Sequence, residues 1–251
     1  MNYVNIVGLR IANIDLYETI KIIEQTLREK SKHLAIFTPN SNFVVKANRD
    51  ANFLAILNQA DILIPDGMPL IWASKFLNTP LKEKVSGSSL FFSICELAAR
   101  CGYSLYFLGG DQGVAEKAAF ELKKKYHKIN IVGTYYAPFG FEYDDSENQK
   151  ILGDINSKKP EILIIGLGAG QGERWIIKHK KEYPAFLSIQ LGASFSFAAG
   201  ITKMPPEWIK RNGFGWLWRL LNEPRRLWKR YLLQDIKIFY YIFQQKYLKR
   251  T

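Results

Sequence analysis

Short, largely apolar runs alternate along the chain with longer segments whose apolar residues recur at helical spacing. The apolar runs predict strands at 33–37, 61–64, 104–108, 129–136, 161–165 and 186–191. The segments between them predict helices at 16–29, 43–59, 70–77, 90–100, 113–126 and 173–181, and one ending near residue 157. Residues 2–11 predict a further strand or hairpin, and residues 192–195 lead into a short helix. The alternation predicts an α/β fold with a mostly parallel sheet and helices on both faces.

Asp66 lies at the tip of a sharp turn between the predicted strand 61–64 and the next helix. Pro65 restricts φ and Gly67 permits a positive φ, so the chain turns directly after the strand. Ligands of open parallel sheets bind at this carboxyl edge of the strands. Asp66 is therefore a candidate catalytic residue, although aspartate also occurs in such turns for conformational reasons alone.

Other predicted strands also end in loops of small or polar residues, at 38–42, 109–110 and 166–172. Glycine lets backbone N–H groups approach phosphate oxygens, and a helix N-terminus favours an anion. These loops therefore predict a nucleotide or nucleotide-sugar ligand. The run 166–172 reads G-x-G-x-G-x-G rather than G-x-G-x-x-G, and no acidic residue follows it at the expected place, which disfavours NAD(P).

Charge divides the chain into two parts. The formal net charge is +12, and residues 201–251 hold 12 Lys and Arg against Glu207, Glu223 and Asp235. The tail thus carries a surplus of +9, which leaves only +3 for the first 200 residues. Because Pro205 and Pro206 interrupt the chain here, we predict a catalytic domain over 1–200 and a helical appendage over 201–251.

The predicted appendage mixes aromatic and cationic side chains, and it contains Trp208, Trp216, Trp218 and Trp228. This mixture suits an anionic membrane surface, and arginines can also bind a diphosphate bidentately. Packing on the body and binding of single-stranded nucleic acid are the alternatives. We prefer the membrane surface and predict no nucleic-acid partner.

No apolar run approaches the roughly 20 residues of a membrane span, and the N-terminus does not resemble a signal peptide. We expect a protein bound peripherally to the inner, cytoplasmic face of the plasma membrane. Cys95 and Cys101 are most simply buried free thiols, and the three histidines show no ligand spacing. No metal site and no cofactor are predicted.

Several segments, in order over nearly the whole chain, resemble the WecG/TagA/CpsF glycosyltransferases. They are Thr-Pro-Asn at 38–40, Ala-Asp to Pro-Asp-Gly at 60–67, Gly-Gly at 109–110, Gly-Ala-Ser-Phe at 192–195 and Leu-Leu-Asn-Glu-Pro-Arg-Arg-Leu-Trp-Lys-Arg at 220–230. The resemblance implies a Rossmann-like core with a C-terminal appendage that docks on the membrane and helps complete the active site. It also implies inverting, metal-independent transfer from a UDP-sugar donor to a polyprenyl-diphosphate-linked acceptor, in the synthesis of exopolysaccharide, teichoic acid or surface antigen.

The resemblance also assigns roles to individual residues. Asp66 would be the general base that deprotonates the acceptor hydroxyl, and Thr38 and Asn40 would hold a substrate beside it. Four arginines would bind the diphosphate and stabilise the UDP leaving group in place of a metal: Arg219, Arg225, Arg226 and Arg230. The other candidate substrate-binding residues are Lys84, Gly109, Gly110, Tyr136, Gly168, Gln171 and Glu173.

Three segments depart from the family pattern. Lys84 and Ser89 stand where the family often has Arg and Asp, Gly172 where it has Gln, and Ser196 where it has Asp. Lysine retains the charge of arginine but loses its bidentate geometry. We interpret the departures as a sign of a different donor sugar or a divergent subgroup, with loss of activity as the alternative.

Two hypotheses from other classes stay open at this point. A nucleotide-dependent oxidoreductase would bind NADH and have no affinity for UDP. A non-catalytic membrane- or nucleic-acid-binding module would bind vesicles or oligonucleotides without a nucleotide. A homo-oligomer is also possible, because a body that needs its appendage to finish the site could self-associate when the appendage is undocked.

Overall fold

The computed structural model describes residues 1–206, 208–209 and 213–248 of the chain. Its strands are β1 (Tyr3–Ile6), β2 (Leu9–Ala12), β3 (Leu34–Phe37), β4 (Ile62–Leu63), β5 (Ser104–Gly109), β6 (Asn130–Tyr135), β7 (Ile162–Gly166) and β8 (Leu187–Gln190). They form one eight-stranded sheet in the order β1-β2-β4-β3-β8-β7-β5-β6. β1 and β2 pair as an antiparallel hairpin, and the other neighbours in this sheet are parallel. The predicted α/β fold is confirmed.

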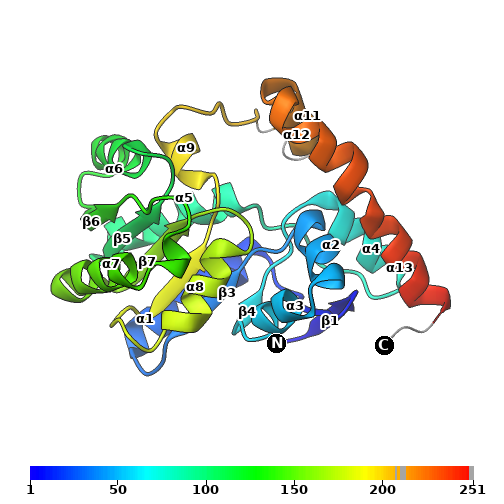
Figure 1. Cartoon of the computed structure of the whole chain (residues 1–251), viewed down its shortest axis with the longest axis horizontal. Coiled ribbons are helices and arrows are strands. Elements are labelled where there is room, and N and C mark those ends of the chain that lie inside the picture. Colours follow the sequence, from blue (N-terminus) through cyan, green and yellow to red (C-terminus); the bar gives the residue numbers. More distant parts are fainter. Residues whose placement is uncertain (207, 210–212, 249–251) are drawn as a thin grey trace.

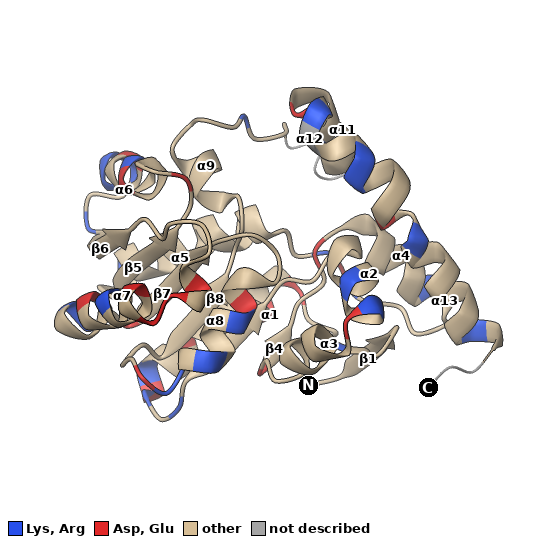
Figure 2. Cartoon of the chain, viewed as in Figure 1, with Lys and Arg blue, Asp and Glu red and all other residues tan. Residues whose placement is uncertain are grey.

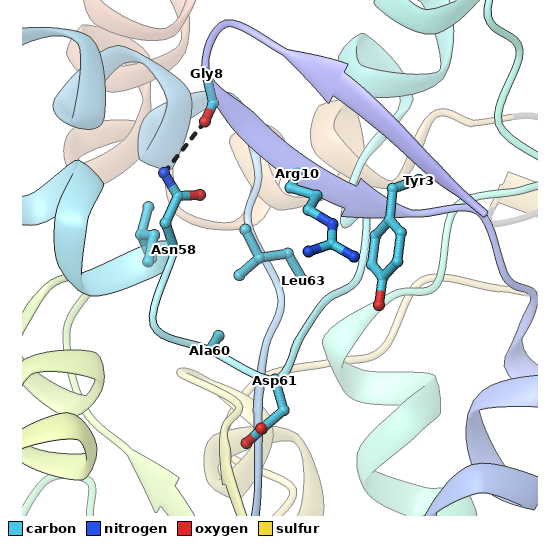
Figure 3. A pocket seen from close by; sticks show the side chains of 8 residues that line it. Tyr3, Gly8, Arg10, Asn58, Ala60, Asp61 and Leu63 are labelled. Carbon is cyan, nitrogen blue, oxygen red and sulfur yellow. Dashed lines mark hydrogen bonds between the residues drawn. The ribbon is translucent and has the colours of Figure 1, made fainter. Parts of the chain in front are cut away.

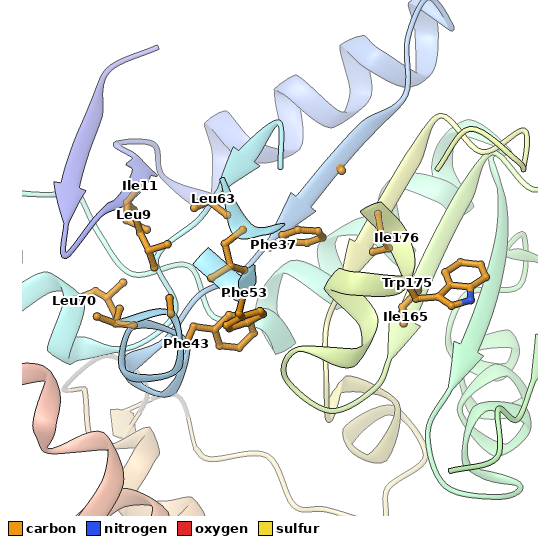
Figure 4. Packing of buried hydrophobic residues seen from close by; sticks show 14 of the residues in the cluster. Leu9, Ile11, Phe37, Phe43, Phe53, Leu63, Leu70, Ile165, Trp175 and Ile176 are labelled. Carbon is orange, nitrogen blue, oxygen red and sulfur yellow. The ribbon is translucent and has the colours of Figure 1, made fainter. Parts of the chain in front are cut away.

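Helices cover both faces of the sheet, as predicted (Figure 1). One face carries α1 (Leu16–Glu29), α5 (Gly87–Cys101), α6 (Val114–Lys125) and α9 (Ser194–Ala198). The other face carries α2 (Ser41–Arg49), α3 (Ala51–Leu57), α4 (Met68–Phe76), α7 (Asp145–Lys158) and α8 (Gln171–His179). Figure 4 shows how Phe43 and Phe53 pack on Phe37 of the sheet, with Trp175 and Ile176 farther along the same layer. A 3-10 turn, η1 (Phe141–Tyr143), precedes α7.

Local sequence signals explain where several helices begin. α1 starts at the predicted residue with a complete capping box, because Asp15 accepts from the Glu18 N–H and Glu18 accepts from the Asp15 N–H. The prediction of one helix over 43–59 is wrong. The segment is two helices, α2 and α3, because the Asp50 carboxylate accepts from the Phe53 N–H at 3.0 Å and caps a new helix.

The prediction that both cysteines are buried is also wrong for one of them. Cys95 is buried and Cys101 is exposed, and both are free thiols. The two positions are six residues apart on α5, so they point about 120° away from each other around an α-helix. Only one of the two can therefore face the sheet.

The C-terminal helices lie along one side of the body, orange to red in Figure 1. They are α11 (Gly215–Asn222), α12 (Pro224–Lys229), the π-helix η2 (Arg230–Asp235) and α13 (Lys237–Tyr247). Ile238 and Ile242 of α13 are buried in the same cluster as α2 and α4, and Gln245 accepts from the Val7 N–H at 2.8 Å. Within the described residues, no helix has both the length and the apolar character that a membrane crossing requires.

Candidate active site

A cavity of about 480 Å³ lies between the carboxyl edge of the sheet and the C-terminal helices. Residues that follow β3, β4, β7 and β8 line it from the body, and residues of α11 and η2 line it from the appendage. β3 and β8 are neighbours in the sheet although the chain leaves β3 toward β4 on the other side. This reversal of strand order is the topological switch point at which open α/β sheets bind their ligands.

Three helices begin at this cavity. α2 is capped by Asn40, α4 follows Gly67 and α5 is capped by Ser86, and all three capping residues are part of the cavity lining. Gly67 has φ +108°, which a residue with a side chain rarely adopts, so the turn after β4 requires glycine. The N-termini of helices favour negatively charged groups, and three of them here suit an anionic ligand such as a diphosphate.

Asp66 lies at the wall of the cavity between the ends of β3 and β4. Its N–H donates to the Pro39 carbonyl at 2.9 Å, which fixes the turn against the loop after β3. A Cβ on Gly87 would stand 3.7 Å from Asp66 Oδ2 and 3.8 Å from Thr38 Oγ1. Gly87 therefore lies close to both predicted catalytic residues, and a side chain there would contact them.

The surroundings of Asp66 act on its carboxylate in opposite directions. Burial raises the pKa of Asp66 above its ordinary value, while the charge of Arg219, the Gly87 N–H, Lys84 and Arg230 lower that pKa. Burial is the largest of these effects, so the group binds a proton more strongly than a solvated aspartate does. A carboxylate with this property suits proton abstraction from a hydroxyl group.

Thr38 and Asn40 are held by hydrogen bonds within the protein. Thr38 is 7% exposed, and its hydroxyl donates to the Gln190 carbonyl at 3.4 Å. Asn40 Oδ1 accepts from the Asn42 N–H at 3.0 Å and from Arg230 Nη2 at 3.3 Å. Asn40 therefore caps α2 and contacts the appendage at the same time.

Positively charged side chains line the cavity on both of its sides. Lys84 contributes it from the body, and Arg219 and Arg230 contribute it from the appendage. The Arg219 Nε is buried and has no hydrogen-bond partner among the residues that the structure describes. A buried donor without a partner costs free energy, so this position suits a bound anion.

The structure brings only part of the predicted site together. Of the predicted residues, the cavity lining contains Thr38, Asn40, Asp66, Lys84, Gly168, Arg219 and Arg230. Gly109, Gly110, Tyr136, Gln171, Glu173 and Arg225 are not part of this lining, and the side chain of Arg226 lies outside the described part of the chain. Their binding roles stay predictions.

The residues outside the cavity have structural contacts of their own. A Cβ on Gly109 would stand 2.6 Å from Leu167 Cδ2, so glycine there permits close packing of two loops. Gln171 donates to Glu142 Oε1 at 3.0 Å. Glu173 is fully buried, its Oε2 accepts from the Gly170 N–H at 2.7 Å, and burial raises its pKa to about 7.

Comparison with known proteins supplies the class of this protein. The sequence model of the Glycosyl transferase WecG/TagA/CpsF family matches residues 4–251. The chain belongs to this family. The predicted resemblance is thereby confirmed, and the chain is a glycosyltransferase rather than an oxidoreductase or a non-catalytic binding module.

Two relatives of this glycosyltransferase share the name N-acetylglucosaminyldiphosphoundecaprenol N-acetyl-beta-D-mannosaminyltransferase. The protein from Bacillus spizizenii is 28% identical over 218 residues, which cover 87% of this chain and 82% of that protein. The protein from Staphylococcus aureus strain MW2 is 26% identical over 239 residues, which cover 95% of this chain and 91% of that protein.

Sequence reasoning missed three polar residues in the lining of the cavity or in contact with it. Gln190 donates from Nε2 to the Leu167 carbonyl at 2.6 Å, and its Oε1 accepts from the Gly192 N–H at 3.3 Å. Asn42 and Asp235 are hydrogen-bonded to each other across the boundary between body and appendage. Asp235 could have been noticed as a lone acidic residue among aromatic and basic neighbours, but Gln190 had no such signal.

A second cavity, of about 270 Å³, lies at the amino end of β4, away from Asp66. Figure 3 shows Arg10 beside Tyr3 in its wall, and the Arg10 guanidinium lies 3.7 Å from the centre of the Tyr3 ring. The Asp61 side chain has a structural role, because its Oδ2 accepts from the Ala35 N–H at 2.8 Å. This cavity contains none of the predicted site residues. Over the described residues, no cluster of three or more His, Cys, Asp or Glu could hold a metal ion.

Proposed function

We propose that this glycosyltransferase moves a sugar from a UDP-sugar, with inversion, to an N-acetylglucosamine linked to polyprenyl diphosphate. The acceptor class is the one for which the relatives from Bacillus and Staphylococcus are named. The observation that carries the proposal is the position of Asp66. It lies with Thr38 in the wall of a cavity whose other wall presents Arg219 and Arg230.

Asp66 acts as the general base of the transfer. Inversion in a single displacement requires one group within hydrogen-bond reach of the attacking hydroxyl. Asp66, Thr38 and Gly87 all line the cavity, and an acceptor hydroxyl in the space beside them comes within hydrogen-bond reach of Asp66 Oδ2. The acceptor hydroxyl occupies this space and gives its proton to Asp66 as the new glycosidic bond forms.

The cations of the cavity stabilise the leaving UDP. Negative charge grows on the β-phosphate as the bond to the sugar breaks, and fixed donors aimed at that charge lower the barrier. Arg219 and Arg230 bind the diphosphate from the appendage, and Lys84 binds it from the body beside the N-terminus of α5. These positive groups take the part that a divalent metal ion has in other transferases, so the reaction proceeds without one.

The appendage places the cavity against a membrane surface. Exposed apolar side chains recur along it, among them Leu221 (70% exposed), Leu233 (55%) and Phe243 (52%). Figure 2 shows Lys and Arg spaced along the same helices. Apolar groups next to cations favour contact with an anionic lipid surface, and a lipid-linked acceptor would be presented there at the mouth of the cavity.

The function is tested by acceptor-dependent release of UDP. Purified protein is incubated with a panel of UDP-sugars that includes UDP-N-acetylmannosamine, with EDTA, and with or without a detergent-dispersed N-acetylglucosamine-diphospholipid. We expect release with one donor, only when the acceptor is present, and unchanged by EDTA. The Asp66→Asn variant should lose about 10²–10⁴-fold in kcat while it keeps its fold. An unchanged rate in this variant would refute the base assignment.

The membrane contact is tested by sedimentation with anionic vesicles. Leu221→Glu should weaken vesicle binding, since it places a negative charge on the proposed surface. Phe139→Glu is the matched control, because Phe139 is 98% exposed but follows β6 on the body. Equal binding by the two variants would show that the appendage is not the contact surface.

A further inference from the structure

Asp235 joins the appendage to the body at the wall of the cavity. It is 8% exposed, and its Oδ1 accepts from Asn42 Nδ2 at 3.1 Å. Its Oδ2 lies 3.4 Å from Arg230 Nε, and Arg230 Nη2 donates to Asn40 Oδ1 at 3.3 Å. Because the Asn42 N–H donates to Asn40 Oδ1, these four residues form a closed ring that crosses from body to appendage twice.

The π-helix η2 makes this ring possible. Arg230 is its first residue and Asp235 its last. In an α-helix, residues five positions apart point about 140° away from each other. In a π-helix the backbone bonds run from i to i+5, so residues five positions apart lie on adjacent turns. The unusual backbone thus brings the carboxylate beside the guanidinium of the same short segment.

The charge of Asp235 is unfavourable for the proposed ligand unless it is neutralised. A carboxylate in the wall of a diphosphate site repels the phosphates and loses hydration by burial. Burial raises the pKa of Asp235, and Arg230 and Asn42 lower that pKa. A buried ion pair of this kind is a weak source of stability. Because the pair adds little stability, we attribute a different role to the buried carboxylate, which is to fix the direction of Arg230.

We propose that Asp235 is a positioning residue for the transfer reaction, which holds Arg230 against Asn40 and so aims the guanidinium at the diphosphate of the donor. Asn42, in the first turn of α2, fixes the other oxygen of Asp235. The position of α2 therefore sets the direction in which Arg230 points. The inference rests on the proposed function, because it assumes that a nucleoside diphosphate occupies the cavity. Asp235 itself does not touch the reacting atoms.

The experiment measures the affinity of the full-length protein for UDP by titration calorimetry. Asp235→Asn keeps the size of the side chain and removes its charge. If Asp235 positions Arg230, UDP should bind about tenfold more weakly to this variant. If Asp235 acts only through its charge, the same variant should bind UDP more tightly, because a repulsive carboxylate is gone. Tighter or unchanged binding therefore overturns the proposal.

The Arg230→Ala background separates positioning from a general structural effect. Asp235→Asn should lower UDP affinity in the wild-type background and have no further effect when Arg230 is absent. An equal loss in both backgrounds would show that Asp235 does not act through Arg230, which also overturns the proposal. Glu116→Gln, at an exposed carboxylate on α6 that is not part of the cavity lining, is the control and should bind UDP like the wild type.

Two further measurements keep the result interpretable. Thermal unfolding checks that each variant is folded, and Asn42→Ala makes the same test from the body if Asp235→Asn does not fold. Wild-type protein that fails to bind UDP would refute the proposed function itself. Wild-type protein that binds UDP, with Asp235→Asn binding equally well, would refute the positioning role alone.

Discussion

Glu173 makes the free energy of unfolding depend on pH, and one substitution isolates its contribution. Its carboxylate is fully buried in the first turn of α8, where Oε2 accepts from the Gly170 N–H and Oε1 has no hydrogen-bond partner among the described residues. Burial raises its pKa from 4.5 to about 7. Glu173→Gln keeps a side-chain oxygen that can accept from the Gly170 N–H, but the glutamine side chain cannot ionise.

The size and sign of the effect follow from this shift. The folded-state pKa is above the unfolded value, so the folded state binds the proton more tightly. The contribution of protonated Glu173 to the stability of the fold is complete below pH 4.5 and is lost as the pH rises through about 7. A shift from 4.5 to about 7 corresponds to a loss on the order of 3 kcal/mol. Glu173→Gln should therefore become more stable relative to the wild type as the pH is raised from 5 to 8.

Urea unfolding of both proteins at several pH values measures this difference. Comparing the two proteins at each pH removes the contribution of every other titrating group. Glu18→Gln is the control, because Glu18 has the same capping position in α1 but a pKa lowered by the Lys82 ammonium and the Asp15 N–H. Since its folded-state pKa lies below the ordinary 4.5, Glu18 stays ionised in both states from pH 5 to 8, so Glu18→Gln should differ from the wild type by a constant amount over this range and lose that difference only at lower pH. A constant difference between wild type and Glu173→Gln from pH 5 to 8 would refute the reasoning.

Three further predictions concern the cavity and the packing of α13 on the body. The acid limb of kcat/KM should have an apparent pKa above the 3.8 of an ordinary aspartate, because burial raises the pKa of Asp66; a limb at or below 3.8 would contradict this. Gly87→Ala should lower kcat/KM without loss of thermal stability, since its Cβ meets Asp66 and Thr38 at ordinary contact distances. Gly153→Ala on α7, whose Cβ would meet nothing within 4 Å, should leave kcat/KM unchanged. Ile238→Ala should lower the free energy of unfolding in urea by about 2–5 kcal/mol, whereas Leu248→Ala, at a side chain 62% exposed, should change it little.

The sequence predicted the fold well because local signals agreed with the final packing. Buried parallel strands read as apolar runs, and Asp15 with Glu18 marked the start of α1. The turn at Asp66 was predictable because Pro65 and Gly67 restrict the backbone on either side of it. The break at Asp50 was missed because its capping side chain lies inside a segment that otherwise keeps helical spacing.

The site was less predictable than the fold because its walls come from distant parts of the chain. Glycine-rich loops after β5 and β7 looked alike in sequence, yet only the loop after β7 lines the cavity. Strand order decides this, since β7 lies next to β8 and β5 lies one strand farther away. Glu173 was predicted to bind substrate, but its first-turn position could equally give the buried cap that the structure contains.

The departures from the family pattern are adapted to their surroundings. Ser86 caps α5, and its hydroxyl donates to Ser89 Oγ at 2.8 Å, so the two residues form a neutral pair in the first turn of α5. A Cβ on Gly172 would stand 3.0 Å from Gln190 Cδ, so glycine leaves room for the Gln190 amide. We propose that the departures change the preference for the donor sugar, and the panel of UDP-sugars tests this directly: activity with UDP-N-acetylmannosamine alone would refute it, and a preference for another donor would support it.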